Sequence, residues 1–360
     1  MAAQDRCCGS YRVWEAPACD QPRLRIVSGK FRQSGAGFPG RGNNAVPDNI
    51  SRRQFTSTLG AAAVAASLGC SQEAGENVTA ALPEETYRVI DPHVHVWKHD
   101  PNYPWPAELR QPPEGDALPE TLLDLMAANG VSHTVIVHVI HYRWDCRYTA
   151  AVVKQYPGKF QGVCRVDPES PTAPDDLSKW VEEYGYRGVR LSPAVNESGE
   201  WINGPLMTPL WQRTRELKIP MTILTRTQRL PDVEKLIGQF EDLDVVIDHM
   251  ADCPVGQPEE LAKLLALAKY PKVFVKISHT WSISQQEYPY RDSWENVKAI
   301  YDAFGPQRLM WGTDWPLVEN SCGYAKALAL VRDEMDFLNA DDKRWILGGT
   351  VERIWPFSAA

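Results

Sequence analysis

The stretch Val89-Ile90-Asp91-Pro92-His93-Val94-His95-Val96-Trp97 is apolar, rich in valine and carries two histidines one residue apart. Because residues i and i+2 of a β-strand point to the same side, the rings of His93 and His95 can reach one metal ion together. The alternative is a pair of histidines that are hydrogen-bonded within a protein core. The stretch therefore predicts a strand and, given partners from other parts of the chain, two metal ligands.

Short β-rich runs alternate with amphipathic helical stretches from residue 87 onward. The predicted strands are 88–94, 134–139, 160–166, 188–191, 221–224, 245–247, 273–277 and 309–311. The predicted helices are 118–129, 173–184, 206–217, 231–240, 258–268 and 293–304. Repeated βα units of this number and spacing predict an α/β fold, specifically a (β/α)8 TIM barrel. A doubly wound open sheet is the alternative, and the chain lacks the glycine-rich phosphate loop typical of it.

The composition narrows the classes of function. The chain has 360 residues, 43% of them hydrophobic and 23% charged, with a net charge of −8, which indicates a globular protein with a sizeable core. Residues 1–53 hold nine Lys or Arg against four Asp or Glu, so the remainder is more acidic than the whole. An acidic body argues against nucleic-acid binding. After residue 70 no apolar run is long enough to span a membrane, and the four later cysteines form no disulfide framework.

Residues 1–85 are predicted to be an N-terminal extension, and 86–360 a barrel domain. The paired Arg52 and Arg53 precede a short apolar stretch, so 51–70 has the layout of a twin-arginine export signal, followed by a linker. We therefore expect export by the twin-arginine route to the periplasm. Cys70 is a candidate lipidation site, and lipid attachment there would give a membrane-anchored lipoprotein. The apolar stretch itself is too short to cross a bilayer as a helix.

Ionisable residues follow several of the predicted strands. In a (β/α)8 barrel the chemistry lies at the C-terminal ends of the strands, whereas residues at the other end mostly serve stability. The residues at predicted C-terminal strand ends are His93, His95, His138, His141, His249, His279 and Asp314. His133 precedes the second predicted strand and belongs to the opposite end. The pattern predicts that the first set gathers at one mouth of the barrel.

Three motifs together resemble those of a known family. They are the His93-Val94-His95 pair, His249 within Asp-His-Met-Ala-Asp-Cys-Pro, and Gly312-Thr313-Asp314-Trp315-Pro316. They resemble the amidohydrolase superfamily, in particular its amidohydrolase-related (type 2) branch, over residues 87–357. That branch includes sugar lactonases and a pyrone dicarboxylate lactonase, and more distantly decarboxylases of the aminocarboxymuconate type. The segment 346–353 also resembles the closing segment of the branch.

The resemblance implies a metal centre. The implied ligands are His93, His95, His249 and Asp314, which as three nitrogens and one carboxylate suit one divalent ion, with Zn²⁺ the favoured candidate. Relatives with two ions use a carboxylated lysine or a glutamate on strand 4 and a histidine on strand 5. Here these strands end in Arg190-Leu191-Ser192 and at Thr225, so we expect a single ion. Some members of the branch work without tightly held metal, and Asp314 would then act as general base with the histidines as electrostatic support.

The resemblance also implies hydrolysis of a carboxylic ester, most simply the opening of a sugar or dicarboxylic lactone by water. Asp314 would take the proton of the attacking water. His279 departs from the lactonase pattern, because lactonase relatives often have Gly at this position and decarboxylase relatives carry a His nearby. Our hypothesis is that His279 protonates the leaving oxygen. The alternative for His279 is a structural hydrogen bond to a neighbouring loop. A non-oxidative metal-dependent decarboxylase, with His279 delivering a proton to carbon, is the second hypothesis. A non-catalytic sugar-binding barrel is the third.

Arginines near the same mouth indicate a small anionic or polyhydroxylated substrate, because a guanidinium matches carboxylate geometry. We assign substrate binding to Arg165, Arg190, Trp97 and His138. The alternative for the arginines is pairing with local carboxylates, and for Trp97 it is core packing. The Pro-rich segment 98–118 is a candidate lid. Assembly as a homo-oligomer is left open by the sequence.

Overall fold

The computed structural model describes residues 87–357 of the chain. The predicted export signal at 51–70, the linker and the candidate lipidation site Cys70 lie outside these residues. The boundary between extension and barrel domain therefore stays a prediction. Within the described part, no helix combines the length and the apolar character needed to cross a membrane.

Eight parallel strands form the centre of the structure. They are β1 Val89–Val94, β2 Val131–Val137, β3 Phe160–Val163, β4 Val189–Leu191, β5 Met221–Ile223, β6 Val245–Ile247, β7 Val273–Lys276 and β8 Leu309–Met310. They pair in chain order in one sheet of three strands and one of five. Parallel bridges between Cys164 and Val189 and between Val94 and Trp315 link the two sheets at both edges. The predicted α/β fold with parallel strands is confirmed, and the pairing order is the one expected of a (β/α)8 barrel.

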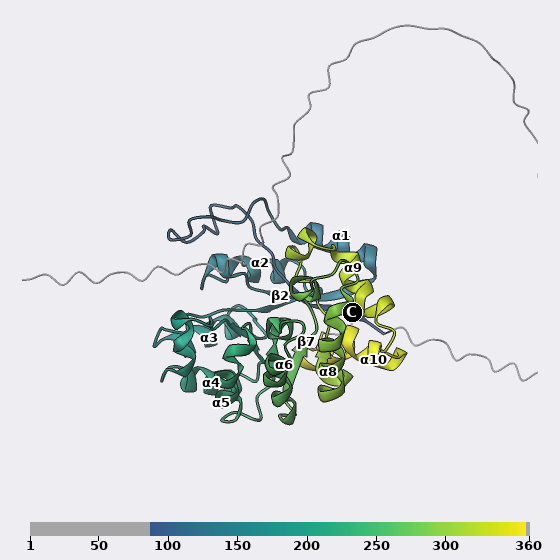
Figure 1. Cartoon of the computed structure of the whole chain (residues 1–360). Helices are drawn as coiled ribbons and strands as arrows, with labels where there is room; N and C mark the ends of the chain where they lie inside the picture. The colour runs from purple at the N-terminus through teal and green to yellow at the C-terminus, as the bar shows by residue number, and fades with distance from the viewer. Residues whose placement is uncertain (1–86, 358–360) are drawn as a thin grey trace, which may run out of the picture. The chain divides into compact units, whose positions relative to one another are not determined.

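Helices surround these strands (Figure 1). The predicted helices correspond to α1 Pro119–Asn129, α3 Ala173–Glu182, α4 Met207–Glu216, α5 Leu230–Ile237, α6 Pro258–Leu265 and α8 Trp294–Phe304. Several begin with proline in the first turn, where its missing N–H leaves no hydrogen bond unmade. The sequence prediction lacked α2 Arg147–Gln155, α7 Thr280–Ile283, α9 Tyr324–Ala329, α10 Ala340–Arg344 and α11 Thr350–Ile354.

The strands are buried on both faces, which explains their nearly continuous apolar sequences. All three residues of β6, for example, are fully buried. A smaller cluster joins Ile90, Val246 and Phe274 to Trp355 and other residues of the C-terminal segment. His133 packs against Phe357 of this segment, with ring centroids 4.7 Å apart. The C-terminal segment therefore covers the end of the barrel at which β2 begins, away from the residues that follow the strands.

The candidate lid is anchored at its base. Trp97 and Ala117 exchange two backbone hydrogen bonds, at 3.0 and 2.9 Å. The Tyr142 hydroxyl donates to the carbonyl of Lys98 and accepts from its N–H. Within the segment, Trp105 stacks on Tyr142 with ring centroids 4.2 Å apart. These contacts fix where the segment leaves the barrel, while its closure over a substrate stays a prediction.

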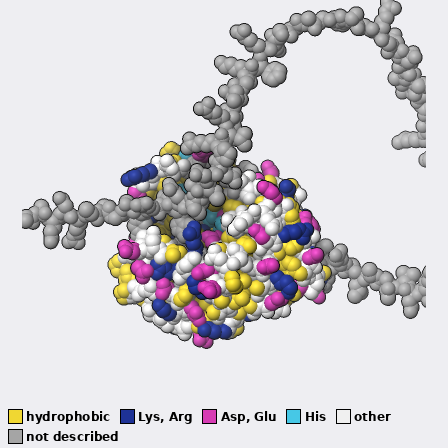
Figure 2. All heavy atoms as spheres, viewed as in Figure 1, with side chains coloured by type: hydrophobic (Ala, Val, Ile, Leu, Met, Phe, Trp, Pro, Cys, Tyr) yellow, Lys and Arg dark blue, Asp and Glu magenta, His cyan; other side chains and the backbone are white. Residues whose placement is uncertain are grey.

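The surface combines charges of both signs. On the face drawn in Figure 2, acidic, basic and hydrophobic side chains are interspersed. Among the described residues, exposed and partly exposed charges form local ion pairs, such as Lys298 with Asp302 and Lys235 with Asp232. Such exposed pairs contribute little to stability, so the fold depends on its buried core.

Gly348 provides a test of how the C-terminal segment closes on β1. A Cβ added there would lie 1.9 Å from the carbonyl oxygen of Arg88, which is backbone and cannot move aside cheaply. We expect Gly348→Ala to lower the free energy of unfolding by about 1–3 kcal/mol or more, as overpacking does. Gly238→Ala is the control, because its added Cβ would meet atoms no closer than 3.5 Å. Equal midpoints of urea unfolding for the two variants would contradict this account.

Candidate metal centre and active site

Five ionisable side chains meet where the strands end. His93 and His95 come from β1 and the segment directly after it, while His249, His279 and Asp314 follow β6, β7 and β8. These last three residues have left-handed backbone conformations, with φ of 52°, 64° and 57°. A non-glycine residue held in this way costs about 1–3 kcal/mol, and such strain concentrates at functional sites. The backbone is thus bent to bring these side chains to the barrel mouth.

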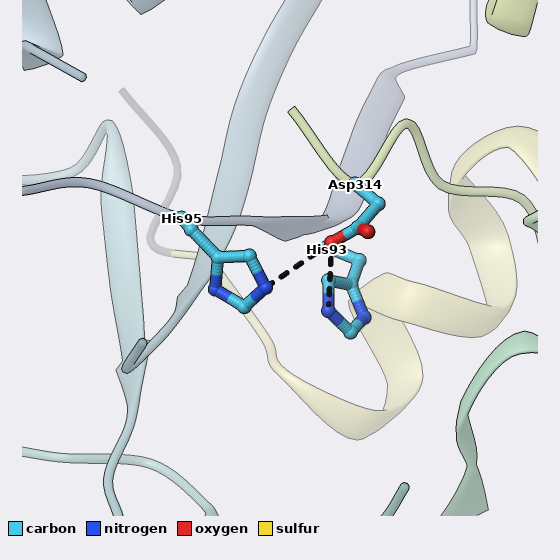
Figure 3. A group of neighbouring side chains, drawn as sticks. All are labelled: His93, His95 and Asp314. Atoms are coloured by element: carbon cyan, nitrogen blue, oxygen red, sulfur yellow. Dashed lines mark ion pairs between the residues drawn. The ribbon is translucent and has the colours of Figure 1, made fainter. Parts of the chain in front are cut away.

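Asp314 joins the two histidines of β1. Its Oδ1 lies 3.1 Å from Nε2 of His95 and 3.4 Å from Nε2 of His93, as the dashed lines in Figure 3 mark. These three residues form a buried group whose ligand atoms all lie within 4.8 Å of one another. Among the described residues, neither His93 Nε2 nor Asp314 Oδ1 has a hydrogen-bond partner, although both atoms are buried. Buried polar atoms are rarely left in this state, and a divalent cation would satisfy both.

His95 is held in the orientation that metal binding requires. Its Nδ1 lies 2.6 Å from the carbonyl oxygen of Val137. Because a carbonyl can only accept, Nδ1 is the donor in this hydrogen bond, and Nε2 is the nitrogen that a metal ion could bind. A backbone carbonyl in this position is a common second partner of metal-binding histidines.

His249 and His279 stand beside this group. Their rings are stacked, with centroids 3.6 Å apart, and the His249 ring centroid lies 4.4 Å from that of His93. His279 Nε2 is 2.5 Å from Asp314 Oδ2. His249 therefore belongs to two adjoining groups, one with His279 and Asp314 and one with His93 and Asp248. The structure brings three of the four predicted ligands into one group and places the fourth next to it.

The charges of the site follow from burial and pairing. Burial disfavours the charged form of His279, but the carboxylates of Asp314 and Asp252 outweigh this and raise its pKa to about 9. Burial also favours the protonated form of Asp314, yet His279 and His95 hold the pKa of that carboxyl well below its usual range. For His93 and His249, burial lowers the pKa well below the ordinary value. The site thus contains an imidazolium–carboxylate pair beside neutral imidazoles.

Asp91 fixes the backbone around the site. Its Oδ1 accepts hydrogen bonds from the backbone N–H groups of His93 and Thr313, and its Oδ2 accepts from the Thr313 hydroxyl at 2.6 Å. Its burial raises its pKa to about 6. Next to it, a Cβ on Gly312 would come 3.2 Å from the Cβ of His93, so a larger residue would crowd the histidine where the segment after β8 approaches β1. Sequence reasoning passed over Asp91, although an Asp two residues before His93 inside an apolar strand was a visible signal.

A buried charge cluster lies behind His93. Asp248 forms ion pairs with Lys276, whose Nζ lies 3.0 Å from Oδ1, and with Arg190, whose Nε lies 2.9 Å from Oδ2. Lys276 Nζ is also 3.1 Å from Nδ1 of His93. All these side chains are at most 3% exposed. Sequence reasoning missed Asp248 and Lys276, and it assigned Arg190 to substrate although the structure pairs it with Asp248.

The other residues predicted to bind substrate lie near the mouth and differ in their hydrogen-bond and ion-pair partners. Arg165 is 2% exposed and donates to the His138 carbonyl and the Ser192 hydroxyl. Within residues 87–357 it has no carboxylate at ion-pair distance. His138 is fully buried against Thr149, and this burial lowers its pKa to about 3. Trp97 donates to the carbonyl of Gly115. The rim arginines Arg147 and Arg229, by contrast, pair with local carboxylates.

Comparison with known proteins places this site in a family. The sequence profile described as Amidohydrolase matches residues 90–357. The chain belongs to the amidohydrolase family. It is 29% identical over 273 residues to an L-fucono-1,5-lactonase of Burkholderia ambifaria, an alignment that covers 73% of this chain and 93% of that protein. It is 26% identical over 230 residues to a 4-sulfomuconolactone hydrolase of Hydrogenophaga intermedia, covering 63% and 74% of the two chains.

The fold is also found among solved amidohydrolases. A crystal structure of an amidohydrolase from Burkholderia multivorans with bound zinc superimposes with a TM-score of 0.61. The two chains are 23% identical, and the match covers 75% of this chain and all of that one. The resemblance drawn from the motifs is therefore confirmed at the level of the family.

Proposed function

We propose that this amidohydrolase is a metal-dependent lactonase that opens a lactone by attack of water at the ester carbonyl. The observation that carries the proposal is the buried group of His93, His95 and Asp314, in which two polar atoms have no hydrogen-bond partner among residues 87–357. Two imidazoles and a carboxylate suit one divalent ion, and Zn²⁺ is the ion we favour. His249 is the neighbouring candidate for a further ligand. The names of the two curated relatives, both of which act on lactones, also support the proposal.

A metal ion in this group would polarise the substrate carbonyl and make a nearby water more acidic. The side chains of the chain account for the proton transfers. As the water oxygen attacks the carbonyl carbon, one water proton passes to the Asp314 carboxylate. The ring C–O bond then breaks, and His279 gives a proton to the leaving oxygen, so the products are a hydroxyl and a carboxylic acid, which releases its remaining proton to solvent. The contact of 2.5 Å between Asp314 and His279 lets the proton on Asp314 return to His279 afterwards.

We further propose that the substrate is anionic or polyhydroxylated. Arg165, Arg190 and Lys276 are all buried near the mouth, and Asp248 is the carboxylate that faces two of them. An excess of buried positive charge is costly unless an anion compensates it. Arg165 is the favoured contact, because it has no ion pair of its own within the described residues, whereas Arg190 is already paired. Trp97 and His138 are proposed to border the substrate on the same side.

Lactone hydrolysis is tested by a panel of sugar and dicarboxylic lactones in a pH-indicator assay, since ring opening releases acid. We expect Asp314→Asn to lower kcat/KM by roughly 10²–10⁴-fold, the usual contribution of a general acid or base. His279→Gln should lower it as well. His133→Gln, at the opposite end of the barrel, is the control and should retain activity. Release of CO₂ from a carboxylic acid, with every lactone untouched, would favour the decarboxylase instead.

The metal centre predicts loss of bound metal when its ligands are replaced. Protein purified without chelator should carry about one divalent ion per chain by elemental analysis. His93→Gln and His95→Gln should each lower this content to a small fraction, because each removes a ligand that the buried group cannot replace. His133→Gln should keep it. An unchanged metal content in both ligand variants would refute the assignment.

We also propose export by the twin-arginine route, on the strength of Arg52 and Arg53 ahead of a short apolar stretch. Changing both residues to lysine should leave the protein in the cytoplasm of a bacterial host, since the route depends on the arginine pair. Cell fractionation with an antibody against the barrel domain measures this. Continued secretion of the double variant would contradict the proposal, and Cys70→Ala separates free from lipid-anchored protein.

A further inference from the structure

A second group of candidate ligands lies directly behind the first. His93, Asp248 and His249 are all buried, and their ligand atoms lie within 4.8 Å of one another. This group shares His93 with the group formed by His95 and Asp314. The two groups use opposite sides of the ring, since Nδ1 of His93 faces Asp248 at 3.4 Å and Nε2 faces Asp314 at 3.4 Å. By residue type alone, the site could therefore hold two ions.

Lys276 stands in the second group. Its Nζ lies 3.0 Å from Asp248 Oδ1 and 3.1 Å from His93 Nδ1, and its side chain is fully buried. A metal ion bound to these two atoms at about 2.0–2.2 Å would need the space that the ammonium fills. The ammonium and a metal ion therefore exclude each other at this position.

The surrounding charges also disfavour a metal ion between His93 and Asp248. The other oxygen of Asp248 faces Nε of Arg190 at 2.9 Å, so one buried carboxylate already has two cationic partners. A divalent ion added next to them would meet two like charges in a buried environment, where such charges interact strongly. Unpartnered buried atoms occur on both sides of the ring, namely the Asp248 oxygens on one side and His93 Nε2 and Asp314 Oδ1 on the other. The difference is that Asp248 faces a lysine and an arginine, whereas within residues 87–357 the ion-pair partners of Asp314 are all histidines, so no ammonium or guanidinium fills the Nε2 side.

We infer that Lys276 takes the place of a second metal ion and thereby restricts this chain to one divalent ion, on the Nε2 side of His93. The inference rests on the metal centre proposed above. Strands 4 and 5 lack the ligands that relatives use to hold a second ion. Lys276 excludes a second ion from the other possible position, between His93 and Asp248, and this is visible only in the tertiary structure. Lys276 is thus a positioning residue, because it acts through His93 and Asp248.

Lys276→Met is the decisive variant, because methionine keeps a stem of similar length and removes the ammonium. We expect the wild type to saturate at one equivalent of Co²⁺ or Zn²⁺ in equilibrium dialysis, and Lys276→Met at two. The Co²⁺ absorption spectrum of the variant should show a second set of bands. Adding Asp248→Asn to Lys276→Met should return the stoichiometry to one, since the carboxylate of the second group is then lost.

Lys272→Met is the matched control. Lys272 forms an ion pair with Asp244 at 3.1 Å. Lys272 lies four residues before Lys276, and Asp244 lies four residues before Asp248. This pair is partly exposed and lies at the opposite ends of β6 and β7. The Lys272→Met variant should bind one equivalent of Co²⁺ or Zn²⁺, like the wild type. If Lys276→Met folds and also binds one equivalent, the inference is wrong.

The inference stays testable if Lys276→Met does not fold alone. Refolding with Zn²⁺ should then restore its native circular dichroism, because the ion replaces the missing cation, and failure to do so counts against the inference. A wild type that binds two equivalents tightly would overturn it directly. A wild type that binds none would overturn the proposed metal centre, and this inference with it.

Discussion

The compensation of buried charge governs the barrel mouth. Asp248 and Asp314 are almost completely buried, and each is surrounded by cationic or imidazole groups from other strands. A carboxylate without such partners would be too costly to bury in a folded protein. The strands therefore have to place Arg190, Lys276 and His279 around these two carboxylates before the site can exist. Stability and chemistry draw on the same side chains here.

The residues that follow β6, β7 and β8 have strained backbone conformations, which the packed barrel maintains. His249, His279 and Asp314 each leave their strand with a left-handed backbone, and the three residues after His249 do the same. A loop free to relax would avoid this conformation. The largely buried strands and the hydrogen bonds that Asp91 accepts from Thr313 supply the rigidity that maintains it. The tightly packed barrel is thus what allows a strained, pre-organised site.

The two ring nitrogens of His93 have separate roles. Nε2 of His93 faces Asp314 and the proposed metal ion, while Nδ1 faces Lys276 and Asp248. A protein cation in contact with the back of a metal ligand can set both its orientation and the number of ions that bind. In the proposed metal centre, this combination is the reason we expect one ion at a site rich in histidine and aspartate, the residues that often hold two metals.

The sequence by itself determined the strands and the residues that follow them. Valine-rich runs predict the strands because parallel strands are buried on both faces, and the histidines at the strand ends indicate which mouth of the barrel is the candidate site. It could not reveal the partner of each charged side chain. Arg190 and Asp248 are 58 positions apart and pair only because β4 and β6 both contribute to one mouth. Nothing in the local sequence distinguishes Lys276 from any other lysine at a strand end, and only the closed barrel places it against His93. Local pattern decides which residues reach the mouth, whereas the contacts among them depend on how the barrel closes, and only the tertiary structure contains that information.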